Sequence, residues 1–237
     1  MELIWEGIKQ AFWLLAYGES EIWAITWLSL KISATATALS LLLGIPIGIM
    51  LALSRFPGRS ITVALINTGM GLPPVVVGLF VSIFLWRSGP LGFLELLYTP
   101  TAMVLAQLVI AFPIVAGLTM AAFQSLNPQL SLQLLGSGAS RLQLLWLLSK
   151  EARLPLLAAV MAGFGGVISE VGASMMVGGN IRGQTRVLTT ATVLETGKGN
   201  FEIAIALGLI LLILTFAVNF LLTHIQQREQ LRWPKPS

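Results

Sequence analysis

Five long apolar stretches dominate the pattern of hydrophobic and polar positions along this chain of 237 residues. They cover about residues 25–53, 61–86, 102–122, 156–177 and 201–222. A helix needs about 20 predominantly apolar residues to cross a bilayer, and each stretch reaches that length. The pattern therefore predicts an all-α polytopic membrane protein with five spans.

Prolines are predicted to interrupt the second and third of these spans. Gly71-Leu72-Pro73-Pro74 divides the second span, and Pro113 lies inside the third. A proline within the bilayer frees backbone groups, which neighbouring helices or a water-filled cavity must then satisfy. Two interrupted spans favour a packed, pore-forming bundle over a simple membrane anchor.

The first 20 residues have a different, amphipathic pattern. Apolar side chains such as Ile8 and Ala11 recur at helical spacing, Trp5 and Trp13 are suited to the membrane interface, and most charges fall on the other face. The segment lacks the basic start and small-residue cleavage site of a signal peptide. We expect an interfacial helix over residues 1–20, with an extension of the first span as the alternative. The predicted division is then this helix, a five-span domain over 21–225, and a cytoplasmic tail over 226–237.

Composition narrows the chemistry available to the chain. Apolar residues make up 56% of it and charged residues 10%, whereas soluble domains carry about 25% charged residues. There is no Cys and no Asp, and His224 is the single histidine. Disulfides and thiol catalysis are excluded, and we expect no metal site. The net charge of +4 is interpreted as a membrane-topology signal rather than as a sign of nucleic-acid binding.

Lysine and arginine are unequally divided between the two sides of a five-span chain. The first loop, the segment between spans three and four, and the C-terminal tail together carry eight, against five on the opposite side. Because cytoplasmic segments carry the excess of Lys and Arg, the N-terminus is expected outside and the C-terminus in the cytoplasm.

The predicted cytoplasmic segment 125–153 is rich in leucine. Asn127-Pro128 predicts a helix start, residues 136–140 (GSGAS) predict a break, and a second helix is expected over 141–153. A solvated loop has no need of so many leucines, so we expect this segment to dock into a partner's groove, with packing on the chain's own spans as the alternative. The candidate docking residues are Leu134, Gly136, Gly138, Ala139, Ser140 and Leu142.

Glu170 is the single acid well inside a predicted span. Ionisable groups at such depth are costly and usually face a bundle interior or a cavity, so a functional role is the default hypothesis. A bare carboxylate would repel an anion, which makes a gate element or a structural buried group the two interpretations. Lys31, entering the first span from outside, is its candidate ion-pair partner.

The end of the fourth span is rich in glycine and is followed by arginines. Gly178-Gly179-Asn180 permits an irregular backbone whose N–H groups form an anion-attracting nest, and Arg182 and Arg186 raise the local anion concentration. The alternative is an ordinary helix-ending loop whose arginines meet lipid phosphates. The candidate pathway or gate residues are therefore Glu170, Gly172, Gly178, Gly179 and Asn180, with Arg182 and Arg186 as an outer anion mouth.

Two stretches carry a resemblance to a known family. Gly138-Ala139-Ser140 and Leu154-Pro155 resemble the coupling loop of the permease subunits of type I ABC importers. The E-A-A positions of that loop read Leu132-Gln133-Leu134 here and lack the acid. The run from Ser169 to Ala173 (SEVGA) and the following GGNI resemble the oxyanion branch of these permeases, most of all its tungstate permeases, with molybdate permeases next.

The resemblance implies a five-span ABC importer permease core in the inner membrane of a prokaryote, moving an oxyanion that we expect to be tungstate. It implies a cytoplasmic ABC ATPase dimer and an extracytoplasmic oxyanion-binding protein as partners. Five spans make a thin wall, so we expect the path to lie at the interface with a second copy. The chain has no G-x-x-x-x-G-K-[ST] loop, so ATP-Mg is expected in the partner ATPase, and no cofactor in this chain.

Two other functions compete with this interpretation. One is an ATP-independent secondary transporter or channel gated by Glu170, against which stands the absence of an internal inverted repeat. The other is an intramembrane hydrolase using a serine of residues 136–140, which lies outside every predicted span and far along the chain from His224. Co-purification with an ATPase distinguishes the importer from the ATP-independent transporter.

Overall fold

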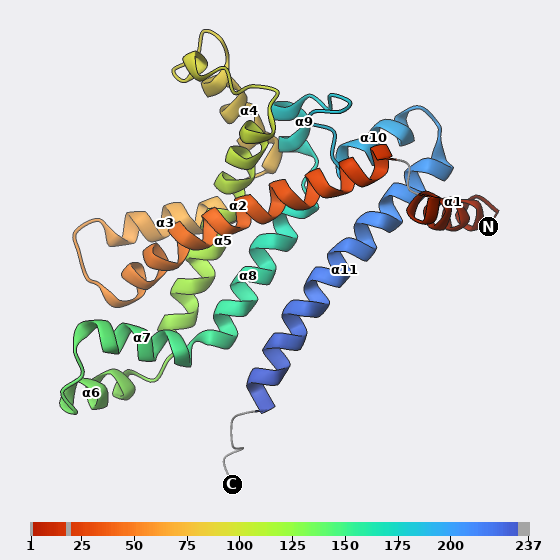
Figure 1. The fold of residues 1–237 in the computed structure, drawn as a ribbon. Helices are drawn as coiled ribbons and strands as arrows, with labels where there is room; N and C mark the ends of the chain where they lie inside the picture. The colour runs from red at the N-terminus through yellow and green to blue at the C-terminus, as the bar shows by residue number, and fades with distance from the viewer. Residues whose placement is uncertain (1, 18–19, 232–237) are drawn as a thin grey trace.

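The computed structural model describes residues 2–17 and 20–231, and within them it contains helices and no strand (Figure 1). The helices in chain order are α1 (Glu2–Tyr17), α2 (Ser20–Leu53), α3 (Arg59–Met70), α4 (Pro74–Leu85), the short 3-10 helix η1 (Gly92–Leu94), α5 (Pro100–Gln124), α6 (Pro128–Gly136), α7 (Arg141–Glu151), α8 (Arg153–Ile168), α9 (Gly172–Gly178), α10 (Leu188–Gly197) and α11 (Phe201–Leu231). The predicted all-α architecture is confirmed.

The described helices provide three membrane spans, or up to the predicted five if each of two bent helix pairs is counted as one span. Helices α2, α5 and α11 are each long and apolar enough to cross a bilayer. The two bent pairs are α3 with α4, at an angle of 107°, and α7 with α8, at 69°. The first bend falls at Gly71–Pro73, where α3 ends and Pro74 opens α4. Two consecutive prolines, Pro73 and Pro74, lack the N–H that a continuous helix requires at this break. The single prolines Pro46 and Pro113 lie inside continuous helices, so the expected interruption of the third span at Pro113 is not observed.

The fourth predicted span differs from the structure. It was expected as one helix over 156–177, whereas α8 ends at Ile168 and α9 begins only at Gly172. At 1.5 Å per residue, the 16 residues of α8 rise about 24 Å. The apolar character of the sequence continues through this break, so hydrophobicity alone did not reveal it.

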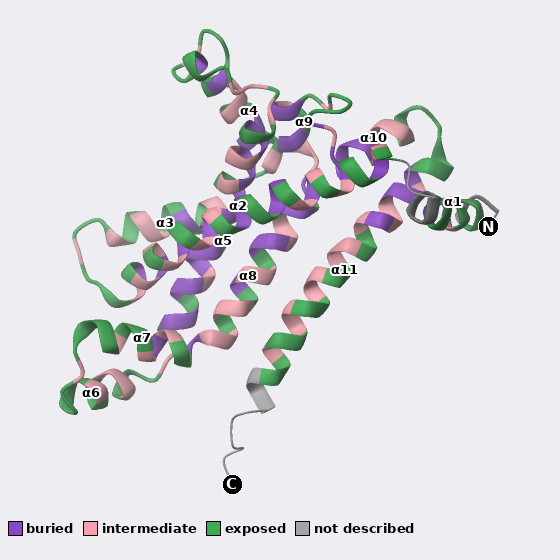
Figure 2. Cartoon of the chain, viewed as in Figure 1, coloured by how far each residue is buried: buried purple, intermediate pink, exposed green. Residues whose placement is uncertain are grey.

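The bundle is centred on α5, which packs against α2, α3, α4, α8 and α9. Its contact with α2 is close because α2 presents glycines there. A Cβ on Gly44 would lie 2.9 Å from Cγ1 of Val115, and one on Gly48 would lie 2.6 Å from the carbonyl oxygen of Ala116. Gly44 and Gly48 therefore permit close helix–helix packing, and both helices are largely buried along their contact (Figure 2).

Helix α1 packs against α11 (Figure 1). Ala11 is buried, and a Cβ on Gly7 would lie 2.4 Å from Cγ2 of Ile205. Trp5, Phe12 and Trp13 remain exposed, so α1 has one face on the protein and one aromatic face turned away. The predicted helix is present, and its position in the membrane interface stays a prediction.

The far end of α11 is less covered than its start (Figure 2). Leu212, Phe216 and Phe220 are exposed there. The helix continues to Leu231, so residues 226–231 of the predicted tail are helical, and residues 232–237 lie outside the described part of the chain.

The bundle has two ends (Figure 1). One, called here the α6 end, holds α6, α7 and the loop between α2 and α3. The other, the α10 end, holds α9, α10 and the start of α2. The segments expected in the cytoplasm thus gather toward the α6 end, and the direction in which the bundle crosses the membrane stays a prediction.

Candidate functional site

Glu170 lies at the break between α8 and α9 and is buried. Its Oε1 accepts a hydrogen bond of 2.9 Å from the backbone N of Ala173, so the carboxylate satisfies a donor in the first turn of α9. Thr189 Oγ1 of α10 donates to the carbonyl oxygen of Glu170 at 3.0 Å. The residue therefore joins three helices at the point where the fourth predicted span divides.

The expected ion pair between Lys31 and Glu170 is not formed. Among the described residues no cation lies within salt-bridge distance of Glu170, and the Lys31 side chain is exposed. The carboxylate is held by the start of α9 instead. A group that needs only a backbone donor can be buried without a cationic partner, which is why depth in the sequence did not predict its contact.

The loop between α9 and α10 is closed by its own hydrogen bonds. Thr185 is fully buried, and its Oγ1 donates to the carbonyl oxygen of Gly178 and accepts from the backbone N of Ile181 at 3.0 Å. Asn180 has a left-handed backbone with φ of 52°, and its Nδ2 donates to the carbonyl oxygen of Thr190 at 3.4 Å. These contacts give the loop a defined shape.

The glycines predicted around this loop occupy the two ends of α9. Gly172 opens α9, where a Cβ would lie 2.5 Å from Cγ2 of Val75 on α4. Gly178 ends α9, and Gly179 follows it with φ of +70°. The Gly179 N–H donates to the carbonyl oxygen of Met175 at 3.0 Å, so it is used within α9 and is not available to an anion nest.

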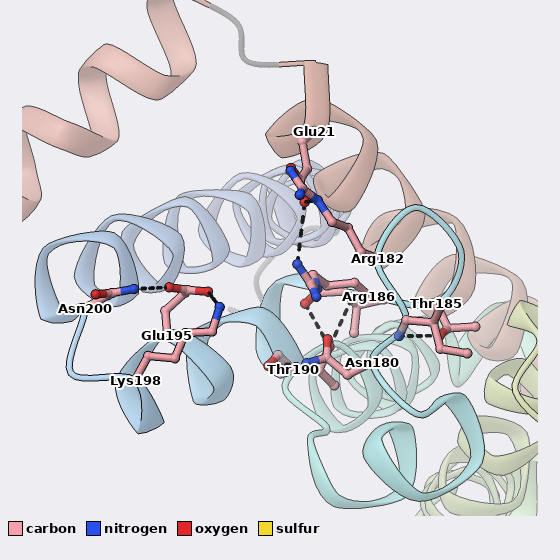
Figure 3. A network of polar contacts seen from close by, with 11 residues as sticks. Glu21, Asn180, Arg182, Thr185, Arg186, Thr190, Glu195, Lys198 and Asn200 are labelled. Carbon is pink, nitrogen blue, oxygen red and sulfur yellow. Dashed lines mark hydrogen bonds and ion pairs between the residues drawn. The ribbon is translucent and has the colours of Figure 1, made fainter.

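Both arginines of the predicted anion mouth meet a carboxylate that sequence reasoning missed (Figure 3). Arg182 holds Glu21 in a two-pronged contact, Nε to Oε1 at 2.8 Å and Nη2 to Oε2. Arg186 Nη1 lies 3.5 Å from Glu21 Oε1. Glu21 stands in the first turn of α2 and is 161 residues from Arg182, so local patterns could not connect them.

A second polar cluster lies beside the first on α10 (Figure 3). Glu195 accepts hydrogen bonds of 2.7 Å from Asn200 Nδ2 and from Lys198 Nζ. The hydrogen bond from Asn200, with that from Lys198, lowers the pKa of Glu195 below its ordinary value. Glu195 is therefore ionised, and its carboxylate oxygens accept hydrogen bonds from Lys198 and Asn200.

Two buried hydrogen bonds tie this end of the bundle together and were not predicted. Gln107 Nε2 of α5 donates to Ser174 Oγ of α9 at 3.5 Å. Ser29 Oγ of α2 accepts from the backbone N of Leu188, the first residue of α10, at 2.8 Å. Gln107 is the single amide side chain of the predicted third span, which was the available signal for a buried contact.

The α6 end has the predicted helix–break–helix arrangement. Asn127 caps α6 by accepting from the backbone N of Gln129 at 2.9 Å. Ser140 and Gln143 form a reciprocal capping box that starts α7. Gly138, between the helices, has φ of +83°, a left-handed conformation that favours glycine.

Helices α6 and α7 have two apolar faces. Leu130, Leu134 and Leu144 are partly buried against the cluster that contains Phe123 and Leu148. Leu132, Leu135, Leu142 and Trp146 are exposed, and we call these four the outward apolar face. Packing on the chain's own spans thus uses only part of the leucines. Leu134, Gly138 and Ala139 line a hollow with Trp146, while Gly136 is the last residue of α6.

The amino-acid sequence matches one protein family and several known proteins over most of its length. Residues 44–230 match a family described as binding-protein-dependent transport system inner membrane component. The tungstate uptake system permease protein TupB of Peptoclostridium acidaminophilum is 42% identical over 229 residues, covering 96% of this chain and 100% of the relative. TupB of Campylobacter jejuni is 35% identical, covering 94% and 93%. The molybdenum transport system permease protein ModB of Escherichia coli K12 is 28% identical, covering 81% and 91%.

Solved structures contain the same fold. A chain of the MetNI methionine ABC transporter, in an inward-facing conformation, superposes with a TM-score of 0.71 at 19% sequence identity, covering 90% of this chain and 99% of that one. At this identity the likeness concerns the arrangement of helices.

Proposed function

The chain belongs to the family of inner membrane components of binding-protein-dependent transport systems, and from this premise we propose that it is the permease subunit of an ABC importer for tungstate. The observation that carries the choice of cargo is the identity of 42% and 35% to two tungstate uptake permeases along nearly their whole lengths. In this role the chain supplies a multi-pass path through the inner membrane and leaves ATP hydrolysis to another subunit.

The outward apolar face of α6 and α7 is the proposed docking element for a cytoplasmic ABC ATPase dimer. Leu132 is 70% exposed and Leu142 is 80% exposed, although both stand on capped, well-defined helices. A contiguous patch of exposed apolar side chains usually marks a surface where another molecule binds. A helix laid into a groove of the ATPase would cover them, and the turn at Gly138 would set the angle between the two helices.

A second copy of the chain is the proposed partner within the bilayer, with the path at the interface between the copies. Gly165 on α8 and Gly208 on α11 support this, because no atom outside their own helices lies within 4 Å of where a Cβ would stand. A glycine inside a helix costs about 0.5–1 kcal/mol relative to alanine. Close approach by another helix would offset that cost, and a two-fold dimer is the simplest closed arrangement.

The α10 end is the proposed extracytoplasmic end, where a separate oxyanion-binding protein delivers the cargo. Arg182 and Arg186 would form the mouth, with the N-terminus outside and the C-terminus in the cytoplasm. The path wall would include Glu170 and its neighbours Gly172, Gly178, Gly179 and Asn180. We propose that Glu170 acts on the path by holding α9 at the break rather than by contacting the anion.

Uptake of radiolabelled tungstate by cells that carry or lack this chain tests the proposal. We expect uptake to require the chain, to stop on ATP depletion, and to be reduced more by unlabelled molybdate than by sulfate. The chain purified in detergent should bring an ABC ATPase with it. Uptake that persists after ATP depletion would instead support an ATP-independent transporter, and stronger competition by sulfate would reassign the cargo.

A further inference from the structure

We propose that Glu21 is a built-in counter-ion of the mouth, and that the hollow between α2 and residues 182–186 binds a tetrahedral oxyanion with two negative charges when Glu21 releases its arginines. The inference rests on the proposed function for the identity of the cargo and concerns how the same end of the molecule is regulated. Three observations support it: the ion pairs of Glu21, the charged residues that line the hollow, and the exposed side chain of Lys31.

The hollow is a defined feature of the α10 end, with a volume of about 600 Å³. One wall is the first three turns of α2, from Ser20 to Lys31, and the other is the loop that contains Arg182, Gln184 and Arg186. Glu21 stands between the two walls and contacts both arginines (Figure 3). The carboxylate thus occupies the position that an anion from outside would take.

Positive residues outnumber negative ones among the described residues that line the hollow. Lys31, Arg182 and Arg186 line it together with Glu21. Glu195 lies nearby but is held by Lys198 and Asn200 (Figure 3). A lining with more cationic than anionic side chains suits tungstate, molybdate or sulfate, which are dianions near neutral pH.

The contact between Glu21 and the arginines is of an exchangeable kind. The Arg182 side chain is 73% exposed and that of Glu21 is 33% exposed, and such solvated ion pairs contribute little to stability. Arg186 is more enclosed, and its buried Nε finds no hydrogen-bond acceptor in the structure. Buried donors are nearly always satisfied, so this one indicates that the set of ligands around Arg186 is incomplete.

Lys31 extends the same surface toward the bundle. It lies ten residues beyond Glu21, which is about 15 Å along α2 at 1.5 Å per residue. Its side chain is exposed, and no carboxylate among the described residues is within ion-pair distance of it. A lysine inside a membrane span usually faces a partner or a water-filled path. Glu170 is not that partner. Lys31 would therefore supply a further positive charge to an anion that has moved past Arg182 and Arg186.

Equilibrium dialysis of tungstate against the full-length chain in phosphatidylcholine nanodiscs tests the inference. The central variant is Glu21→Gln, which keeps the side-chain size and removes the charge. Removing one negative charge a few ångströms from a dianion in water should tighten binding about tenfold at low ionic strength. Lys31→Gln and Arg186→Gln should weaken binding by a similar factor. Glu202→Gln, at an exposed carboxylate of α11 that does not line the hollow, is the matched control and should leave binding unchanged.

Unchanged or weaker tungstate binding by Glu21→Gln, with Glu202→Gln like the unmodified chain, would overturn the proposal and leave Glu21 a structural tie. Loss of binding when phosphatidylglycerol replaces phosphatidylcholine would overturn it in favour of a lipid-headgroup site. An effect of Glu21→Gln on docking of the binding protein, without one on tungstate, would overturn it in favour of a protein contact. ATP-dependent uptake by unmodified cells is measured separately, so failure of the transport function is recognised independently of the dialysis.

Discussion

Replacing Gly138 should weaken ATPase docking through the backbone alone. Gly138 has φ of +83°, and no heavy atom lies within 4 Å of where its Cβ would stand. The requirement for glycine in this chain is therefore conformational and not steric. A residue with a side chain costs roughly 1–2 kcal/mol in this conformation, and asparagine tolerates it better than alanine does.

The backbone strain at position 138 destabilises the docked complex rather than the free permease. The turn is exposed, so a strained loop can relax to another shape when nothing holds it. Docking must then restore the left-handed conformation at the full cost of roughly 1–2 kcal/mol, which weakens binding by about 5- to 30-fold. Gly138→Ala should show this loss, Gly138→Asn a smaller one, and Gly138→Glu a larger one because it adds a charge beside the outward apolar face.

Gly136 provides the matched control two residues away. It is the last residue of α6, its φ is not positive, and it too has open space where a Cβ would stand. Gly136→Ala should weaken docking less than Gly138→Ala does, because it imposes no backbone strain. The assay is titration of the purified ATPase onto the permease in nanodiscs, with substrate-stimulated ATP hydrolysis in proteoliposomes as the functional readout. Equal affinities for the variants at Gly136 and Gly138 would refute the argument, and a Gly138→Glu protein that keeps its ATPase and transports normally would show that this segment is not the docking element.

Three further predictions follow from the packing and topology. Single cysteines at Arg55 and Gly197 should differ in intact cells, with only the cysteine at Gly197 labelled by an impermeant thiol reagent, and the reverse pattern would contradict the proposed orientation. Gly7→Leu should detach α1 from α11, because a Cβ at Gly7 already lies 2.4 Å from an α11 side chain, and limited proteolysis should then cut α1 while the remaining bundle stays intact. Glu170→Gln keeps an acceptor for the N–H of Ala173 and should change thermal stability little, whereas Glu170→Ala should cost about 1.5–3 kcal/mol because it removes a hydrogen bond to a charged acceptor. Similar melting temperatures for both variants would argue against this role of the hydrogen bond.

The sequence predicted those parts of the fold that local patterns control. Apolar length identified the long helices α2, α5 and α11, Asn127-Pro128 marked the start of α6, and residues 136–140 marked the break between α6 and α7. Helix starts and turns depend on residues within about one helical turn of one another, and a span depends on one continuous apolar segment. The same reasoning located the break at Gly71–Pro74 but not the one between α8 and α9, where no proline interrupts the segment.

The predicted ion pair of Glu170 with Lys31 was inferred from the depth and charge of Glu170 in the sequence, and it is not formed in the structure. The sequence placed a carboxylate inside an apolar run, and the nearest available expectation was a cation on another span. In the structure the helix itself ends before Glu170, which frees an N–H at the start of α9 for the carboxylate. A helix break converts a residue that needs a distant partner into one that is satisfied three residues away, and hydropathy carries no signal of that break.

The pairing of Glu21 with Arg182 and Arg186 depends on contacts that fix α10 against α2. Ser29 accepts from the first backbone N of α10, which places the preceding loop beside the start of α2. Thr185 then holds that loop in shape from within. Because buried hydrogen bonds position the loop, the exposed ion pair need not supply the stability of this end. Glu21 is thus able to exchange its arginines for an arriving anion without unfolding the structure that presents them.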